Sequence, residues 1–144
     1  MNHWSFPALF TATEEGGYVI TFRDLPEAIT QWETLDGAIT AAMDCLDEAI
    51  ARRIDDGLNI PIPSRPAEGE RPVALPAQMV LKAILYVALR DAGITKAELA
   101  RRIGVNEKEV RRMLDPRHGT KLPALEAALR ALGMSLVLEA RDAA

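Results

Sequence analysis

The stretch TKAELARRIGVNEKEVRRML, residues 95–114, decides the fold of the C-terminal half of the chain. It predicts two short helices joined by a tight turn. Thr95 can cap the first helix, and Glu98, three residues later, can complete a capping box. Gly104 is expected to end this helix, because glycine readily adopts left-handed backbone. Asn106 begins the second helix with the same capping pattern.

Apolar residues give each of these helices a buried side. In the second helix this side consists of Val110, Met113 and Leu114. The small side chain of Ala100 allows the two helices to cross closely. The arrangement is typical of a helix-turn-helix, which presents its second helix to the major groove of duplex DNA. The alternative interpretation is a helical hairpin that carries two caps and a glycine without binding DNA.

The polar residues of this region are expected to contact DNA in different ways. Lys108 and Arg112 lie near the front of the second helix and are predicted to contact base edges. Glu107 can accept a hydrogen bond from a cytosine amino group, and Arg111 can reach a base or a phosphate. A single motif of this size contacts few bases, so we expect a homodimer or higher oligomer on a palindromic operator. Contacts with the DNA backbone are predicted at the helix starts and on the following loop, at Thr95, Lys96, Asn106, Arg117, His118 and Lys121.

The net charge of −4 over 144 residues conceals a division between the two halves. Residues 1–75 contain 13 acidic and 5 basic side chains, a net charge of −8. Residues 76–144 contain 8 acidic and 12 basic side chains, a net charge of +4. A basic half suits a phosphate backbone, whereas an acidic half is repelled by one. The N-terminal half is therefore expected to have another role.

Cysteine and histidine are too few to define a site. Cys45 is the one cysteine, so no internal disulfide is possible, and it is interpreted as a small buried residue. His3 and His118 lie far apart and give no metal-ligand spacing, so no metal or other cofactor is expected. No stretch resembles a signal peptide or a membrane span. We expect a cytoplasmic protein that does not bind membranes.

The N-terminal half predicts a small sheet with one helix across it. Alternating apolar residues at 4–12 and 18–23 predict a hairpin, and 28–34 a weaker third strand. A long helix is expected from Thr34 or Asp36 to Gly57, on apolar residues at helical spacing. A last short strand is expected at 59–63. The predicted class is α+β.

Five prolines between residues 61 and 76 mark a change in composition, which we interpret as a semi-rigid linker. The predicted units are 1–63, a linker at 64–75, and a helical bundle at 76–144. Beyond the two helices of 95–114, this bundle is expected to contain helices at 76–92 and 123–132, followed by a strand or extended tail at 134–139.

Carboxylates are the only side chains of the N-terminal half that suggest catalysis. Asp24, Asp36, Asp44 and Asp47 could in principle bind a divalent metal, as the acids of ribonuclease H-type nucleases do. Each also has a structural interpretation: Asp36 favours a helix start, and Asp24 stabilises a turn. No phosphate loop, nucleophile elbow or Cys/His dyad is present. We therefore expect no catalytic residue and no enzyme.

One face of the predicted long helix is mostly acidic. It carries Asp44, Asp47, Glu48 and Asp55. A basic protein partner would be attracted to these charges. A solvated face without a partner explains the same pattern, and both interpretations stay open.

The segment GYVITFRDLPEAITQWETLDGAITAAMDCLDEAI, residues 17–50, resembles the N-terminal domain of HicB antitoxins. It has the strand, the Asp24-Leu25-Pro26 turn and the alanine-rich helix of that family. It departs from the family at Arg23, where a proline is common, and at Glu27-Ala28. The C-terminal half resembles phage-repressor helix-turn-helix proteins, and one branch of HicB proteins combines the two domains.

The resemblance implies a degenerate ribonuclease H-like first domain without catalysis. It implies a HicA-type toxin that cleaves mRNA as partner, which the antitoxin neutralises through the first domain, and repression of the operon that encodes both. Two other hypotheses stay open. One is a stand-alone repressor that senses a ligand in a pocket lined by Trp4, Tyr18 and Trp32. The other is a nuclease with a DNA-targeting domain.

Overall fold

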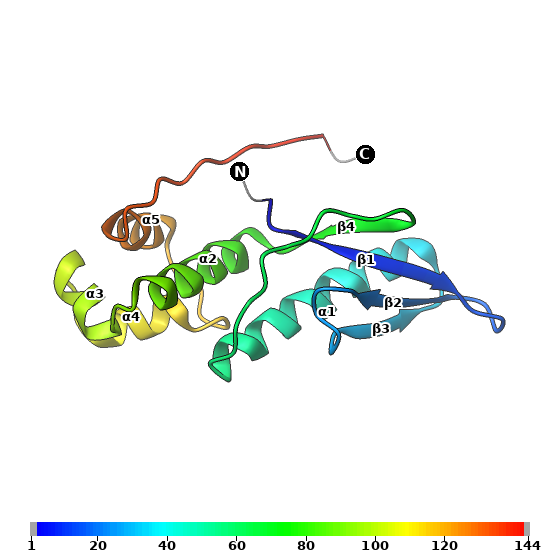
Figure 1. The fold of residues 1–144 in the computed structure, drawn as a ribbon, viewed down its shortest axis with the longest axis horizontal. Coiled ribbons are helices and arrows are strands. Elements are labelled where there is room, and N and C mark those ends of the chain that lie inside the picture. The colour runs from blue at the N-terminus through cyan, green and yellow to red at the C-terminus, as the bar shows by residue number, and fades with distance from the viewer. Residues whose placement is uncertain (1–2, 143–144) are drawn as a thin grey trace.

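The computed structural model describes residues 3–142, and Figure 1 shows an elongated molecule. A four-stranded sheet with helix α1 lies at one end, and helices α3, α4 and α5 lie at the other. Helix α2 lies between them. The mixed α+β class that the sequence predicts is confirmed.

The sheet is antiparallel with the strand order β3-β2-β1-β4. The first two strands form the predicted hairpin, in which Ala12 lies opposite Tyr18. Gly16 and Gly17 form its turn with φ of 88° and 93°, a conformation that other residues rarely adopt. The strands are β1 Ser5–Ala12, β2 Tyr18–Phe22, β3 Ile29–Trp32 and β4 Glu70–Ala74.

Helix α1, Leu35–Asp55, packs its apolar side against one face of the sheet. Thr34 caps it, because its Oγ1 accepts a hydrogen bond from the Gly37 N–H at 3.1 Å. Leu46 and Ile50 of this helix are fully buried in the same core as Phe6 and Ile20 of the sheet. The alternation and the helical spacing of apolar residues thus predict the core of this half correctly.

The fourth strand lies where the sequence predicts a linker. Residues 59–63 form no strand, so that prediction was wrong. Instead β4 pairs with β1, and Pro72 lies opposite Pro7. Because proline has no backbone N–H group to donate to the neighbouring strand, the two facing prolines argue against a strand here, and the sequence did not predict one. Segment 64–75 is therefore partly an element of the sheet.

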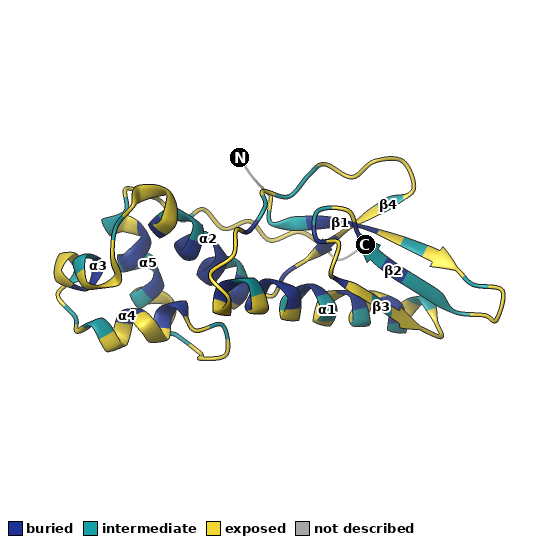
Figure 2. Ribbon diagram, turned by 60° about the horizontal axis from the view of Figure 1, so that its bottom comes forward, coloured by how far each residue is buried: buried dark blue, intermediate teal, exposed yellow. Residues whose placement is uncertain are grey.

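The C-terminal half consists of four helices around a shared core. Their apolar residues include Leu85, Leu99, Val110 and Leu125, all fully buried. Figure 2 shows that the buried residues of α3 and α4 alternate with exposed ones along each helix. Beyond α5, residues 134–142 are extended without strand pairing. The helices are α2 Ala77–Ala92, α3 Lys96–Ile103, α4 Glu107–Leu114 and α5 Leu122–Ala131.

The two halves contact each other beyond the chain connection. Tyr86 of α2 donates a hydrogen bond from its hydroxyl to the Leu58 carbonyl at 2.7 Å. Arg90, one turn later, donates to the Gly57 carbonyl at 2.8 Å and to Asn59 Oδ1 at 2.9 Å. Since these bonds fix the C-terminal part of α2 to the turn that follows α1, the halves share an interface.

Candidate functional site

Helices α3 and α4 form the predicted pair, and their N-terminal caps are present. Thr95 Oγ1 accepts from the Glu98 N–H at 3.1 Å, and Asn106 Oδ1 accepts from the Glu109 N–H at 3.0 Å. Gly104 ends α3 with a φ of 72°, as expected. Ala100 is buried where the helices cross.

Glu98 does not return the capping hydrogen bond that the sequence predicts. Its carboxylate instead accepts from Arg101 at 2.6 Å and from Arg102 at 3.0 Å. These two guanidinium groups lower the pKa of Glu98 to about 2. The Glu98 carboxylate therefore forms its ion pairs within its own helix, because Arg101 and Arg102, three and four residues later, are within its reach.

The outer side of α4 carries the residues predicted to contact bases. Lys108, Arg111 and Arg112 are exposed, while Val110, Met113 and Leu114 are buried beneath them. Arg111 forms an ion pair with Glu107 at 2.7 Å. Among the described residues, the side chains of Lys108 and Arg112 form no ion pair or hydrogen bond. Thr95, Lys96 and Asn106 are also exposed at the starts of the two helices.

A buried lysine that the sequence reading missed holds the end of α4. Lys82 of α2 is 0% exposed, and its Nζ donates to the carbonyls of Arg112 at 3.0 Å and Met113 at 2.9 Å. It also donates to Thr120 Oγ1 at 2.9 Å. A cation here satisfies the free carbonyls and the negative end of the helix. Burial lowers the pKa of Lys82 to about 8, although nearby Asp115 opposes the shift.

The loop after α4 carries three residues predicted to contact phosphate, Arg117, His118 and Lys121. One of the three, Arg117, is engaged by acidic residues of α1. Arg117 forms ion pairs with Asp55 and, at 3.2 Å, with Glu48. Both acids belong to α1, in the other half of the chain. His118 and Lys121 are exposed. The structure therefore brings one predicted DNA contact together with two residues predicted to bind a partner protein.

The acidic side chains of α1 border a groove beside strand β3. This groove, which we call the acidic groove, has a volume of about 510 Å³. Asp44 and Glu48 line it from the helix, with Arg52 as the one basic residue among its lining residues. Ile29 and Trp32 line it from the strand and are 61% and 53% exposed. Because β3 is an edge strand, its outer backbone groups border the same open surface.

Asp47 lies on another side of α1 and does not line the groove. It is half-buried, and its Oδ1 has no hydrogen-bond partner among the described residues. Burial raises the pKa of Asp47, and the neighbouring charges of Glu48 and Asp44 raise it further. The four acids that the sequence predicts as one set therefore lie in three places. Asp44 and Glu48 line the groove, Asp55 pairs with Arg117, and Asp47 is half-buried.

The indole ring of Trp32 packs against Gly37 in the first turn of α1. A Cβ atom added at Gly37 would lie 2.0 Å from the Trp32 indole nitrogen, so only glycine leaves room for this ring. Tyr18 lies opposite Trp32 across the β2–β3 pair. Trp4 lies at the other end of β1 and stacks edge-on against Phe6 at 6.3 Å. The three aromatic residues of the ligand-pocket hypothesis therefore do not line one pocket.

Between residues 3 and 142, no three His, Cys, Asp or Glu side chains lie together as a metal site would require. None of the helices in this range is both long and apolar enough to cross a membrane.

Comparison with known proteins gives consistent matches along the chain. Residues 5–84 match a family model described as HicB_like antitoxin of bacterial toxin-antitoxin system. Antitoxin HicB of Escherichia coli strain K12 is 38% identical over 133 residues, 92% of this chain and 96% of that protein. Antitoxin HicB 1 of Photorhabdus laumondii is 36% identical, over 96% and 88% of the two chains. Antitoxin HicB of Pseudomonas fluorescens is 33% identical over 94% of each.

Proposed function

Because the chain belongs to the HicB-like antitoxin family of bacterial toxin–antitoxin systems, we propose that it neutralises a HicA-type toxin and represses its own operon. In this proposal the sheet and α1 bind the toxin, an mRNA-cleaving protein. The α3–α4 pair binds operator DNA as a helix-turn-helix, with the protein as a dimer. Both activities are placed in the cytoplasm, and neither makes this chain an enzyme.

The observation that carries the toxin-binding part is the acidic groove. It combines the carboxylates of Asp44 and Glu48 with the exposed apolar side chains of Ile29 and Trp32. Charged groups of this kind accelerate the encounter with a basic protein. Half-exposed aromatic side chains supply most of the final affinity once they are buried in a partner.

The exposed side of α4 supports the DNA-binding part. Lys108 and Arg112 extend from a helix whose other side is fully packed, so the side chains stand on a rigid base. Thr95 and Asn106 cap the N-termini of α3 and α4, and helix N-termini bind phosphate groups well. Lys82 holds the far end of α4 in place.

Mixing of the full chain with a HicA-type toxin tests the toxin-binding part. The double variant Asp44→Ala/Glu48→Ala should bind the toxin about tenfold more slowly at low salt, because two steering charges are lost. Glu14→Ala/Glu68→Ala is the matched control, since these exposed acids lie outside the groove and change the charge equally. Equal association rates for the two double variants would exclude the groove as the toxin-binding surface.

A further inference from the structure

The loop between α4 and α5 is held near its end by a side chain of α2. Gln78, in the first turn of α2, bonds to both backbone groups of Thr120. Its Oε1 accepts from the Thr120 N–H at 2.9 Å, and its Nε2 donates to the Thr120 carbonyl at 3.1 Å. A side-chain amide that pairs with both backbone groups of one residue fixes the position and the orientation of that residue, as a neighbouring strand would.

The hydroxyl group of Thr120 is bonded as well. It accepts from Nζ of the buried Lys82 at 2.9 Å and donates to the Arg112 carbonyl at 3.4 Å. Gln78 and Lys82 are four residues apart, so they lie one above the other on the same side of α2. This side of α2 therefore holds the end of α4 and the end of the following loop together.

Thr120 directly precedes the start of α5, where Lys121 is the N-cap residue. Thr95 and Asn106 cap α3 and α4 with their side chains, but no side chain of the described residues caps α5. The two hydrogen bonds from Gln78 thus take the place of a local cap in fixing where α5 begins. Because Lys121 is the next residue and is exposed, they also fix the backbone from which its ammonium group extends.

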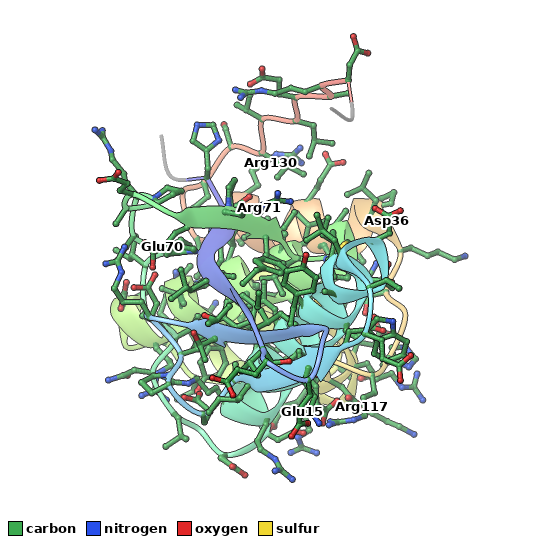
Figure 3. The ribbon with its side chains drawn as sticks, turned by 90° about the vertical axis from the view of Figure 1, so that its right-hand side faces the viewer. Glu15, Asp36, Glu70, Arg71, Arg117 and Arg130 are labelled. Carbon is green, nitrogen blue, oxygen red and sulfur yellow. The ribbon has the colours of Figure 1, made fainter. Side chains whose placement is uncertain are left out.

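The first part of the loop is held differently. Asp115 accepts hydrogen bonds from the Arg117 N–H at 3.0 Å and from the His118 N–H at 3.2 Å, through its carboxylate and its carbonyl respectively. Arg117 lies at the edge of the molecule in the view of Figure 3, and its guanidinium group pairs with acids of α1. Of the three residues on this loop that are predicted to contact phosphate, Lys121 is therefore the one that α2 positions.

We propose that Gln78 is a positioning residue for DNA binding, which holds Lys121, through Thr120, where its ammonium group meets the phosphate backbone. This inference rests on the proposed function and deepens it, because it gives α2 a part in a contact that α2 does not make itself. The amide oxygen and nitrogen of Gln78 are already bonded to Thr120. A lysine side chain is long and flexible, so a fixed backbone reduces the entropy lost when its ammonium group binds a phosphate.

The salt dependence of DNA binding distinguishes this role from a general loss of stability. A cation that contacts phosphate releases counterions, so losing one such contact reduces the slope of log affinity against log salt by about one. Gln78 carries no charge, so its replacement changes the slope only if a cation elsewhere loses its phosphate. A smaller folded fraction, in contrast, lowers the affinity at every salt concentration and leaves the slope unchanged.

Gln78→Met tests the proposal in the full chain, with duplex DNA from the promoter of its own operon as the probe. Methionine keeps the length and the helix propensity of glutamine but forms neither hydrogen bond to Thr120. The affinity should fall severalfold, and the salt slope should fall by about one. Gln31→Met, which replaces an exposed glutamine of β3, is the matched control and should leave both quantities unchanged.

A double-mutant cycle with Lys121→Ala tests whether the two residues act through one contact. If Gln78 acts through Lys121, Gln78→Met should reduce neither the affinity nor the slope further in the Lys121→Ala background. Faster hydrogen exchange of the Thr120 N–H in Gln78→Met should accompany the effect, as measured by NMR. An additive loss of affinity with an unchanged slope would show that Gln78 contacts DNA directly or only stabilises the fold, and would overturn the proposal.

These outcomes separate the inference from the proposed function. If the chain binds the promoter duplex and Lys121→Ala lowers the salt slope but Gln78→Met does not, the proposed function stands and the inference is refuted. If Lys121→Ala leaves the slope unchanged, Lys121 contacts no phosphate and the inference is refuted as well. If the unmodified chain does not bind the duplex, the DNA-binding part of the proposed function is refuted, and the inference with it.

Discussion

Arg117, on the loop between α4 and α5, forms an ion pair with Asp55 near the C-terminal end of α1, 62 residues earlier in the chain. It also contacts Glu48, which lines the acidic groove. The guanidinium group thus joins the half proposed to bind DNA to the half proposed to bind the toxin. All three side chains are largely exposed, so the contact contributes little to stability.

Removal of Arg117 should speed the binding of a basic toxin. Arg117→Ala leaves Asp55 and Glu48 without their cation and so increases the negative field at the groove. We expect the association rate at low salt to rise severalfold, while the free energy of unfolding stays nearly unchanged because the pair is exposed to solvent. Arg130→Ala, which removes an exposed arginine of α5, is the control for net charge. Stopped-flow mixing with the toxin measures both, and equal rates would contradict the prediction.

Residues on α4 and on the next loop should affect DNA binding differently. Lys108→Ala and Arg112→Ala should each relax the base preference at one operator position, by about 1–3 kcal/mol. Lys121→Ala should weaken binding to every sequence alike and reduce the slope of log affinity against log salt by about one. Competition gel shifts over a set of operator variants measure these effects. If Arg112→Ala leaves the base preference unchanged, α4 meets the groove with another side.

The operator should consist of two half-sites related by a two-fold axis. Dimers of this class place their recognition helices about 34 Å apart, in successive major grooves. Scrambling one half-site of the promoter should therefore abolish cooperative binding in a gel shift. An isolated half-site that binds as tightly as the whole operator would contradict this expectation.

Lys82 should titrate near pH 8. Its side chain is buried, whereas the other three lysines, Lys96, Lys108 and Lys121, are exposed. The pKa of Lys82 in the fold, about 8, lies below its unfolded value of 10.5. The unfolded chain therefore binds more protons between these values, and this group makes the protein more stable as the pH rises from 8 to 10.5. NMR of lysine Cε resonances measures the titration.

Lys82→Met tests the structural role of this lysine. It leaves the carbonyls of Arg112 and Met113 without their donor and should cost about 1–3 kcal/mol of stability at pH 7. It should also remove the rise in stability above pH 8. Operator affinity should fall because the end of α4 loosens. If urea melts show the same pH dependence in both proteins, Lys82 is not the titrating group.

The contact between Trp32 and Gly37 should be essential for toxin binding and dispensable for DNA binding. Gly37→Ala puts a methyl group where the indole lies and so displaces the ring from the groove. Toxin affinity should fall at least tenfold, as for loss of an aromatic anchor, with operator affinity unchanged. Gly119→Ala, which meets no atom within 4 Å, is the control. Isothermal titration with the toxin distinguishes the two variants.

The sequence by itself determined the features that depend on neighbours along the chain. Thr34, Thr95 and Asn106 cap their helices by accepting a hydrogen bond from the N–H group three residues later. Four consecutive residues are therefore enough to specify where each of these helices begins. The periodic apolar residues of α1 and α4 specify which side is buried, as Leu46 and Val110 show.

Only the tertiary structure decided the features that join distant segments. Strand β4 has little pattern of its own and forms because β1 offers it an edge. The buried cation of Lys82 and the turn of Arg117 toward Asp55 depend on groups about 30 and 62 residues away in the chain. The same holds for the half-buried carboxylate of Asp47, which its helical spacing places among exposed acids. Local hydrogen bonds and periodicity select helices and strands, whereas the packing of those elements decides which polar side chains meet.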